Sequence, residues 1–287
     1  MQLVHSAADL SAVLDSFRAA GKSVGFVPTM GALHAGHLSL VEQMRAETDV
    51  VVVSIFVNPK QFGAGEDFDK YPRTLEADLA ALETLGRGAG APDIVFAPAV
   101  EDVYPPGQPV EQQYAGPVGQ TFEGAARPGH FDGMLTVVAR LFDLVQPDVA
   151  IFGQKDAQQL FLVQQLAAAK YPDLEIIGAP IVREPSGLAM SSRNRFLNSE
   201  QLDIAEILAI SLATMSQLIG GGMSASEALA IGAEMISSEP ETKLDYLALV
   251  DPQTFAVVGD EHTGAALLIV AAIVGEVRLL DNHLFEI

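Results

Sequence analysis

The chain has no cysteine and no tryptophan among its 287 residues. Without thiols it can form no disulfide bond, iron–sulfur cluster or thiolate zinc site, and it has no cysteine nucleophile. Phenylalanine, with 14 residues, supplies most of the aromatic content. These absences exclude several classes of redox and thiol chemistry.

Basic residues are also few. The chain has 16 Lys and Arg against 37 Asp and Glu, which gives a formal net charge of −21 at pH 7. A chain this acidic repels nucleic-acid phosphates and anionic membrane surfaces, apart from any local basic pocket. We therefore expect neither nucleic acid nor a membrane as a partner, although acidity alone names no substrate.

Long apolar runs are scarce as well. The most apolar stretch, 265–274, is well short of the roughly 20 residues that a membrane-spanning helix needs. The N-terminus shows no basic segment followed by an apolar block, so no secretory signal is expected. With 49% apolar and 18% charged residues, the composition excludes intrinsic disorder. These features predict a folded, cytoplasmic protein.

The hydrophobic pattern predicts an α/β fold with two domains, 1–180 and 181–287. In the first part, short β-rich runs alternate with helical patterns, as in a parallel sheet with crossover helices. The expected strands are 23–27, 50–57, 93–97, 148–152 and 175–178, and the expected helices are 37–46, 74–85, 133–145 and 157–169. Beyond a boundary near Pro180, the pattern indicates a smaller α+β domain, with helices at 199–219 and 224–237 and strands at 244–250, 267–274 and 277–280.

The segment 28–40, PTMGALHAGHLSL, leads from the first expected strand into a helix. His34 and His37 are three residues apart and so share a helix face. A helix N-terminus favours phosphate, and imidazoles there can donate hydrogen bonds as charge develops. The pattern resembles the signature of the nucleotidyltransferase superfamily. Two histidines that cap a turn are the structural alternative, while zinc is disfavoured because no third ligand lies nearby.

Asn58 and Gln61 follow the second expected strand, in the segment 54–63, SIFVNPKQFG. Neutral amides both donate and accept hydrogen bonds, which suits a ligand with hydroxyls and a carbonyl. Taken alone, however, an Asn-Pro turn beside a solvated Gln61 is the favoured explanation.

A charged segment, 67–74 (DFDKYPRT), is followed by Glu76 and Asp78. Carboxylates here, including Asp67, could hold magnesium directly or through water. A charged loop before the first turn of a helix is the more common use of such residues.

The segment 123–138, EGAARPGHFDGMLTVV, places Arg127, His130 and Asp132 before an apolar helix. It fits a loop that closes over a ligand. It fits equally well a rigid helix start that Asp132 caps.

The segment 152–160, FGQKDAQQL, again leads from a strand into a helix. Lys155 is a point charge at the helix start, which suits a phosphate. Asp156 could cap the helix, bind a ribose hydroxyl or help to hold magnesium, and Gln159 projects from the first turn. A capped surface helix is the alternative.

The segment 190–194, MSSRN, lies near the expected domain boundary. Two hydroxyls and an arginine can hold the β- and γ-phosphates of a nucleotide, with bidentate geometry from the arginine. Domain boundaries are preferred places for ligands. Because the sequence patterns of serine hydrolases are missing, Ser191 is a poor candidate for an activated nucleophile.

Six ordered segments, PTMGALHAGH, FVNPKQF, YPRT, ARPGHFDG, FGQKD and MSSRN, together with a C-terminal LLDN, resemble the pantothenate synthetase (pantoate–β-alanine ligase) family over nearly the whole chain. The resemblance implies a Rossmann-like first domain, a smaller domain closing over the site, and a homodimer. It implies that ATP and Mg²⁺ support the condensation of (R)-pantoate with β-alanine through a pantoyl adenylate, releasing AMP and pyrophosphate.

By position, the resemblance also implies residue roles. His37 would donate a proton, with His34, Lys155 and Arg193 neutralising phosphate charge. The implied substrate contacts for pantoate and β-alanine are Gln61, Gln159 and Asn58. The implied ATP-binding residues are Met30, Gly31, Ala32, Leu33, His34, Ala35, Gly36, His37, Gly153, Gln154, Lys155, Asp156, Val182, Met190, Ser191, Ser192 and Arg193. Gln154 departs from the Glu of many relatives, and no residue is assigned to the metal.

Two other functions compete with this one. The chain could transfer AMP to a phosphorylated acceptor, but the neutral Gln61 and Gln159 argue against it, because such an acceptor would need extra cations. It could also be a nucleotide sensor without turnover, which has no evident need for both the histidine pair and the acceptor-side glutamines. In the favoured interpretation, the histidines, the Lys155 turn and the Ser-Ser-Arg segment converge on one triphosphate.

Overall fold

A computed structural model describes residues 1–63, 68–86 and 90–287, so Asp67 lies outside the described residues. The chain forms two compact units: Met1–Gly153 with Leu162–Ala179, and Gln154–Phe161 with Pro180–Ile287. The second unit thus resumes at Pro180, but it also includes Gln154–Phe161, which the expectation of a single boundary did not foresee.

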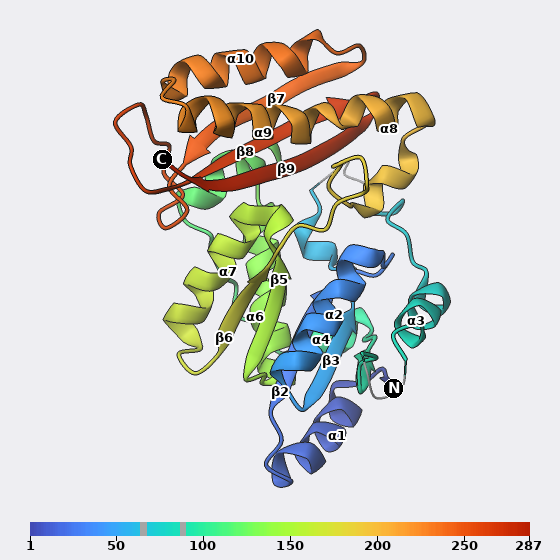
Figure 1. Cartoon of the computed structure of the whole chain (residues 1–287). Coiled ribbons are helices and arrows are strands. Elements are labelled where there is room, and N and C mark those ends of the chain that lie inside the picture. Colours follow the sequence, from blue (N-terminus) through green and yellow to red (C-terminus); the bar gives the residue numbers. More distant parts are fainter. Residues whose placement is uncertain (64–67, 87–89) are drawn as a thin grey trace. The chain divides into compact units, whose positions relative to one another are not determined.

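The first unit is built on a parallel sheet in the order β1-β4-β3-β2-β5-β6. Figure 1 labels its strands β2, β3, β5 and β6. All its strand pairs are parallel, which confirms the predicted α/β class. The strands are β1 (Gln2–Val4), β2 (Val24–Thr29), β3 (Val50–Ile55), β4 (Ile94–Phe96), β5 (Val149–Gly153) and β6 (Glu175–Ala179).

Helices connect these strands, as crossover topology requires. The longer ones are α1 (Ala7–Ala19), α2 (Ala35–Glu47), α3 (Leu75–Glu83), α6 (His130–Val145) and α7 (Ala157–Lys170). Short turns of helix are α4 (Val100–Val103), α5 (Glu123–Ala126), η1 (Pro59–Gln61), η2 (Val118–Gln120) and η3 (Gln154–Asp156).

The centre of this sheet is completely buried. Val51, Val52 and Val53 of β3 are 0% exposed, which confirms that the β-branched run forms a strand covered on both faces. β2 pairs with β3 on one side and with β5 on the other, so the strand order changes direction at β2. Such a switch point is where open α/β sheets bind ligands, beyond the carboxyl ends of the strands.

The second unit combines helices with an antiparallel sheet in the order β7-β8-β9 (Figure 1). Its elements outside the shared helix α7 are η4 (Ser192–Phe196), α8 (Ser199–Ala205), α9 (Ile207–Gly220), α10 (Ala225–Ser238), β7 (Thr242–Val250), β8 (Ala265–Val274) and β9 (Val277–Glu286). The expected single helix 199–219 is therefore two helices. β9 is also longer than expected, because its polar half, past Leu280, still pairs with β8.

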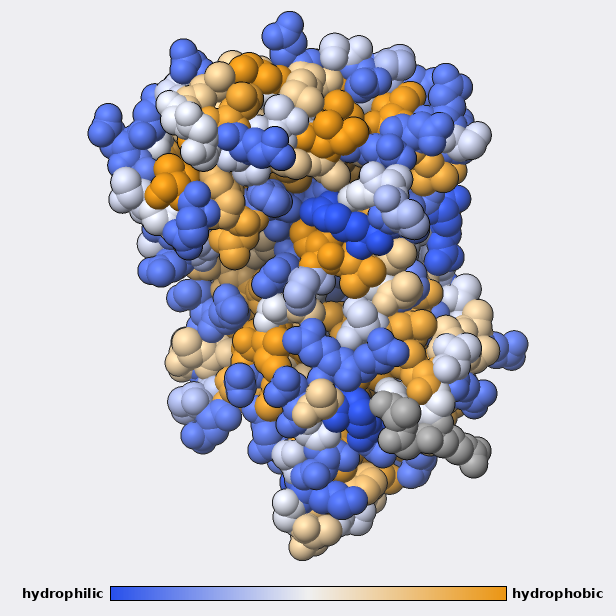
Figure 2. All heavy atoms as spheres, viewed as in Figure 1, coloured by the Kyte–Doolittle hydropathy of each residue, from blue (hydrophilic) through white to orange (hydrophobic). Residues whose placement is uncertain are grey.

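One helical segment, Ser199–Gly220, is long and apolar enough to cross a membrane by length and composition, which the search for apolar runs in the sequence missed. Leu208, Leu212 and Met215 of α9 pack into the core of the second unit. Packing in that core accounts for the apolar composition of these residues. On the face shown in Figure 2, apolar side chains lie in small groups among polar ones.

Candidate functional site

The turn between β2 and α2 carries the first histidine to the start of a helix. β2 ends at Thr29, and His34 is the N-cap of α2. Gly31 (φ 82°) and Ala32 (φ 51°) both have positive φ, so the chain reverses within a few residues. The turn therefore presents the N-terminus of α2 at the switch point of the sheet.

Both histidines cap α2 through the same ring atom. His34 Nδ1 accepts a hydrogen bond from Gly36 N at 3.1 Å, and His37 Nδ1 accepts one from His34 N at 3.4 Å. The two bonds form a reciprocal capping box, and the ring centroids are 4.1 Å apart. The capping alternative is thus observed, and it does not exclude a role in binding.

These caps determine the protonation pattern of the rings. Since each Nδ1 accepts a backbone N–H, the proton of each neutral imidazole lies on Nε2. The backbone thus fixes both rings with Nε2–H as the donor, beside the positive end of the α2 dipole. This arrangement suits hydrogen bonding to an anion such as a phosphate group.

A buried carboxylate supports the turn. Asp78 of α3 is 2% exposed, and its oxygens accept hydrogen bonds from Leu33 N at 2.7 Å and Ala32 N at 3.1 Å. Thr74 Oγ1 donates to the same carboxylate at 3.3 Å. A Cβ atom on Gly31 would lie only 2.9 Å from Asp78 Oδ2, so this position requires glycine for space as well as for φ. Asp78, which the sequence offered as a possible magnesium ligand, instead holds the backbone of the turn.

Asn58, in the predicted segment 54–63, is a buried residue that makes several side-chain hydrogen bonds. It is 1% exposed, and its Nδ2 donates to Gln61 Oε1 at 3.2 Å and to Gly133 O at 3.1 Å. Its Oδ1 accepts from Lys60 N at 3.2 Å and from Tyr104 Oη at 2.8 Å. Burial raises the pKa of the Tyr104 phenol, which keeps it protonated as a donor. Asn58 therefore fixes η1 and the amide of Gln61.

Gln61 packs against Met30 in the turn between β2 and α2, which we call the histidine turn (Met30–His37). The sequence alone favoured a solvated Gln61, and the structure contradicts that expectation. The residue is 7% exposed, and its Nε2 lies 3.0 Å from Met30 Sδ. His130 Nδ1 lies 2.9 Å from Gln61 O. Since a carbonyl only accepts, His130 carries its proton on Nδ1, the opposite of the capping histidines. Neutral groups thus position Gln61 beside the turn.

The segment around Arg127 leads directly into helix α6. α6 begins at His130, earlier than expected, and Gly129 is its N-cap without a side-chain cap. Asp132 therefore does not cap the helix as the sequence suggested; its Oδ1 accepts from Ala115 N at 2.8 Å. The Arg127 guanidinium (Nη1) lies 3.8 Å from Oε1 of Glu123, four residues earlier in the chain.

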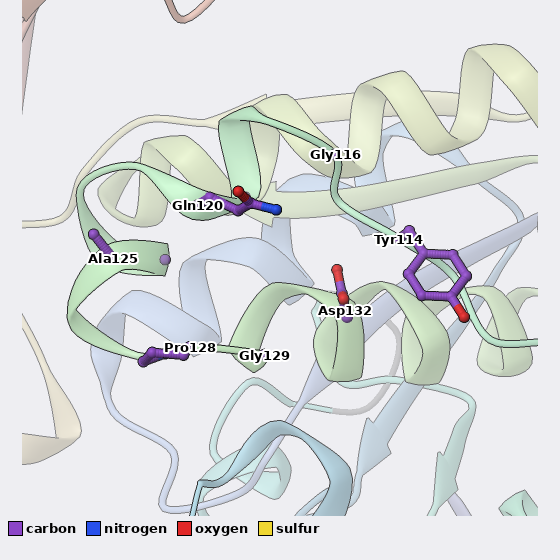
Figure 3. Close-up of a pocket in the computed structure, with 9 residues that line it drawn as sticks. Tyr114, Gly116, Gln120, Ala125, Pro128, Gly129 and Asp132 are labelled. Carbon is purple, nitrogen blue, oxygen red and sulfur yellow. The ribbon is translucent and has the colours of Figure 1, made fainter.

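A pocket of about 440 Å³ opens beside this helix start (Figure 3). Asp132 and Gln120 are its polar lining side chains besides Tyr114, and small residues form the rest. None of the predicted ATP or pantoate contacts lines it. The pocket therefore shares no lining residue with the histidine turn.

In the second unit, Lys155 lies in η3, which leads directly into α7. Its Nζ lies 3.4 Å from Asp156 Oδ1, so the two charges pair within the turn. Gln159 follows in the first turn of α7 and is half-buried. The backbone of this turn is bound by β9, because Asn282 Nδ2 donates to Gln154 O at 2.8 Å and to Lys155 O at 2.9 Å.

The MSSRN segment emerges from a small hairpin. Arg183 and Ala189 pair as an antiparallel bridge, and Met190 N donates to Val182 O at 3.0 Å. Ser191 is the N-cap of η4, and its Oγ accepts from Arg193 N at 3.2 Å. The predicted nucleotide-binding residues Val182 and Met190–Arg193 thus belong to one hydrogen-bonded unit.

The structure therefore groups the predicted residues into two sets. Met30–His37, Asn58 and Gln61 form one set in the first unit, and Gly153 ends β5 in the same unit. Gln154–Asp156, Gln159, Val182 and Met190–Arg193 belong to the second unit. The C-terminal LLDN segment contains the buried pair Asp281 and Asn282, to which the sequence analysis gave no role and which it placed just beyond the expected strand 277–280.

No group of three or more His, Asp or Glu side chains in residues 1–63, 68–86 and 90–287 is arranged to hold a metal ion. Asp78 is bound by backbone N–H groups and Asp156 is paired with Lys155. The described residues therefore do not fit a metal centre made of protein ligands alone.

Comparison with known proteins extends these observations. A model of the pantoate-beta-alanine ligase family matches residues 2–284. A pantothenate synthetase of Thermus thermophilus is 48% identical, and the match covers 98% of each chain. That of Leifsonia xyli subsp. xyli is 50% identical over 91% of this chain and 88% of the relative.

Solved structures agree. A crystal structure of pantothenate synthetase from Thermus thermophilus matches with a TM-score of 0.91 at 47% identity, over 99% of both chains. A pantoate-beta-alanine ligase from Francisella tularensis, complexed with beta-gamma ATP and beta-alanine, matches with a TM-score of 0.78 at 34% identity, over 99% of this chain and 97% of the other. The ordered motifs, the parallel sheet and these matches together show that the chain belongs to the pantoate–β-alanine ligase family.

Proposed function

We propose that this chain condenses (R)-pantoate with β-alanine in two steps driven by ATP. A pantoate carboxylate oxygen attacks the α-phosphorus, the bond to the bridging oxygen breaks, and pyrophosphate leaves. The amine of β-alanine then attacks the activated carbonyl carbon, loses a proton, and displaces AMP. No protein nucleophile takes part, in keeping with the missing cysteine.

The observation that carries this proposal is the double cap of α2. Because both Nδ1 atoms accept backbone N–H bonds, both imidazoles present Nε2–H donors from fixed rings. Such pre-oriented donors stabilise the charge that develops on the phosphates as pyrophosphate leaves. We assign proton donation to His37 and phosphate binding to His34.

The residues proposed to bind ATP are Met30–His37, Gly153, Gln154–Asp156, Val182 and Met190–Arg193. Lys155 and Arg193 supply the positive charges. The electrostatic logic is that two anionic substrates need local cations in a chain whose net charge is −21.

Pantoate, and later β-alanine, is assigned to Gln61 and Gln159. The groups that touch the Gln61 side chain, Met30 and Asn58, are neutral, which suits a hydroxy acid better than a phosphorylated acceptor. Asn58 stays in the predicted acceptor site, and its full set of protein hydrogen bonds favours an action on the substrate through Gln61.

Magnesium is proposed to arrive as a complex with the ATP phosphates, because Mg²⁺ commonly keeps its waters and binds through substrate phosphates. We further propose a soluble, cytoplasmic homodimer with no nucleic-acid or membrane partner. The acidic charge and the core packing of α9 support this environment.

One assay tests the reaction. The protein is incubated with ATP, Mg²⁺, pantoate and β-alanine, and AMP is followed while each acid is omitted in turn. We expect sustained AMP release only when both acids are present. AMP release that is equal without β-alanine, AMP transfer to a phosphorylated acceptor, or nucleotide binding without turnover would each contradict the proposal.

A further inference from the structure

Two adjacent residues of β9, Asp281 and Asn282, bind the backbone and side chains next to the proposed phosphate-binding segments of the second unit. Asp281 binds Arg183 in the hairpin before Met190, and Asn282 binds the turn that contains Lys155. Asp281 and Asn282 are 3% and 5% exposed, although both are polar. Buried polar groups are retained where their hydrogen bonds are satisfied. Since neighbouring side chains of a strand point to opposite faces, this pair reaches two different segments.

Asp281 binds the hairpin that leads to Met190–Arg193. Its carboxylate accepts a bidentate pair of hydrogen bonds from Arg183, at 2.6 and 2.9 Å. The same guanidinium donates to Gly187 O at 3.0 Å, across the hairpin turn. Bidentate Arg–carboxylate pairs fix orientation as well as distance. The hairpin therefore has a defined orientation relative to β9.

Asn282 binds the backbone of the turn that contains Lys155. Its single Nδ2 donates to two successive carbonyls, those of Gln154 and Lys155, at 2.8 and 2.9 Å. A primary amide supplies two N–H donors without charge, whereas a carboxylate of the same shape supplies none. The chemistry of this contact thus selects asparagine over aspartate.

We propose that Asp281 and Asn282 are positioning residues for ATP, acting through Arg193 and Lys155 respectively. The inference rests on the proposed function, because it assumes that these two cations bind phosphate. The strand fixes the two segments in one register, so that the cations need little reorganisation when the triphosphate binds.

The test measures binding of α,β-methylene-ATP with Mg²⁺ by calorimetry, beside thermal unfolding of each variant. Asn282→Asp should weaken binding about tenfold or more, because its carboxylate faces two carbonyl oxygens. Asp281→Asn should weaken it by about the same factor. Asp245→Asn is the matched control, since it breaks the 2.7 Å ion pair between β7 and Arg278 of β9 and leaves both segments untouched. It should bind like the wild type.

Double-mutant cycles separate positioning from general weakening. In a Lys155→Ala protein, Asn282→Asp should cost little further affinity, whereas Asp281→Asn should still weaken binding about tenfold. In an Arg193→Ala protein, Asp281→Asn should cost little further affinity, whereas Asn282→Asp should still weaken binding about tenfold. If Asp281→Asn does not fold, Arg183→Lys replaces it, because it keeps the charge and loses the bidentate geometry. Fully additive losses, or unchanged binding in Asn282→Asp, would overturn the inference. A wild type that fails to bind the analogue would instead contradict the proposed function.

Discussion

The two units hold their proposed phosphate-binding loops with side chains of opposite hydrogen-bonding character. In the first unit, the Asp78 carboxylate accepts from the N–H groups of Ala32 and Leu33. In the second unit, the Asn282 amide donates to the C=O groups of Gln154 and Lys155. The difference shows that the backbone group a loop presents to the core decides which side chain can support it.

The first loop also differs in how its functional groups are fixed. His34 and His37 are both the caps of α2 and the proposed donors, so structure and chemistry share the same rings. Lys155 pairs with its neighbour Asp156, and its turn is held from β9. Changing the histidine ring itself should therefore cause the largest loss of function in the first unit, while changing the side chain that supports a loop should weaken nucleotide binding in either unit.

His37→Ala should have the largest effect, because it removes both a cap and the proposed proton donor. We expect single-turnover formation of the adenylate to slow by about 10²-fold or more. His5→Ala is the control, since His5 is an exposed histidine whose ring lies against Ala97 O. Near-normal adenylation by His37→Ala would remove the role given to His37.

Asp78→Asn sharpens the comparison between acceptor and donor supports. The amide would turn a donor toward a backbone N–H, or leave one N–H without its acceptor, so we expect the free energy of unfolding to fall by about 2 kcal/mol. ATP affinity should fall about tenfold. Thr74→Val, which removes only the 3.3 Å contact to the same carboxylate, should have a clearly smaller effect in both measurements. Equal stability and affinity in Asp78→Asn would show that the charge is not needed.

Gln61→Ala tests whether the first unit separates acceptor binding from nucleotide binding. We expect pantoate binding to weaken about tenfold, the scale for losing one or two hydrogen bonds, with ATP binding nearly unchanged. Calorimetry with each ligand provides the measurement, and the exposed Gln120→Ala is the control. Loss of ATP affinity with pantoate affinity intact would reverse the acceptor assignment.

The smallest expected effect is the contribution of His283, in β9, to the pH dependence of the free energy of unfolding. Burial and the nearby charge of Arg183 lower the pKa of His283, although Asp281 opposes the shift. Below its usual pKa of about 6.5, the unfolded chain binds a proton that the folded chain binds less readily, so His283 makes stability rise with pH through that range. His283→Asn should reduce this rise in thermal unfolding scans between about pH 5 and 7. An unchanged pH slope would contradict this contribution.

Much of the fold could be predicted from the sequence because local patterns specify it. The β-branched run Val50–Val53 identified a buried strand, and the alternation of strands with helices identified the parallel sheet. The break at Glu206 escaped prediction because no glycine or proline marks it. The polar end of β9 also escaped, since its strand character comes from pairing with β8.

The site was predictable only in part. The motif residues were found because glycines, histidines and a strand coincide. The roles of Asp78 and Asn282 depend on contacts with segments distant in sequence, which no local spacing encodes. Sequence reasoning treated capping and phosphate binding by His34 and His37 as alternatives, whereas the observed caps use only Nδ1, so the proposed phosphate binding through Nε2–H is compatible with capping.

The central proposal is that His34, His37, Lys155 and Arg193 bind one triphosphate. A crystal structure of the protein with α,β-methylene-ATP, Mg²⁺ and pantoate tests it most directly. We predict that His34 and His37 Nε2, Lys155 Nζ and the Arg193 guanidinium all lie within hydrogen-bonding distance of the phosphates of the same nucleotide, with pantoate on Gln61. A bound nucleotide that contacts the histidines but neither Lys155 nor Arg193 would contradict the account.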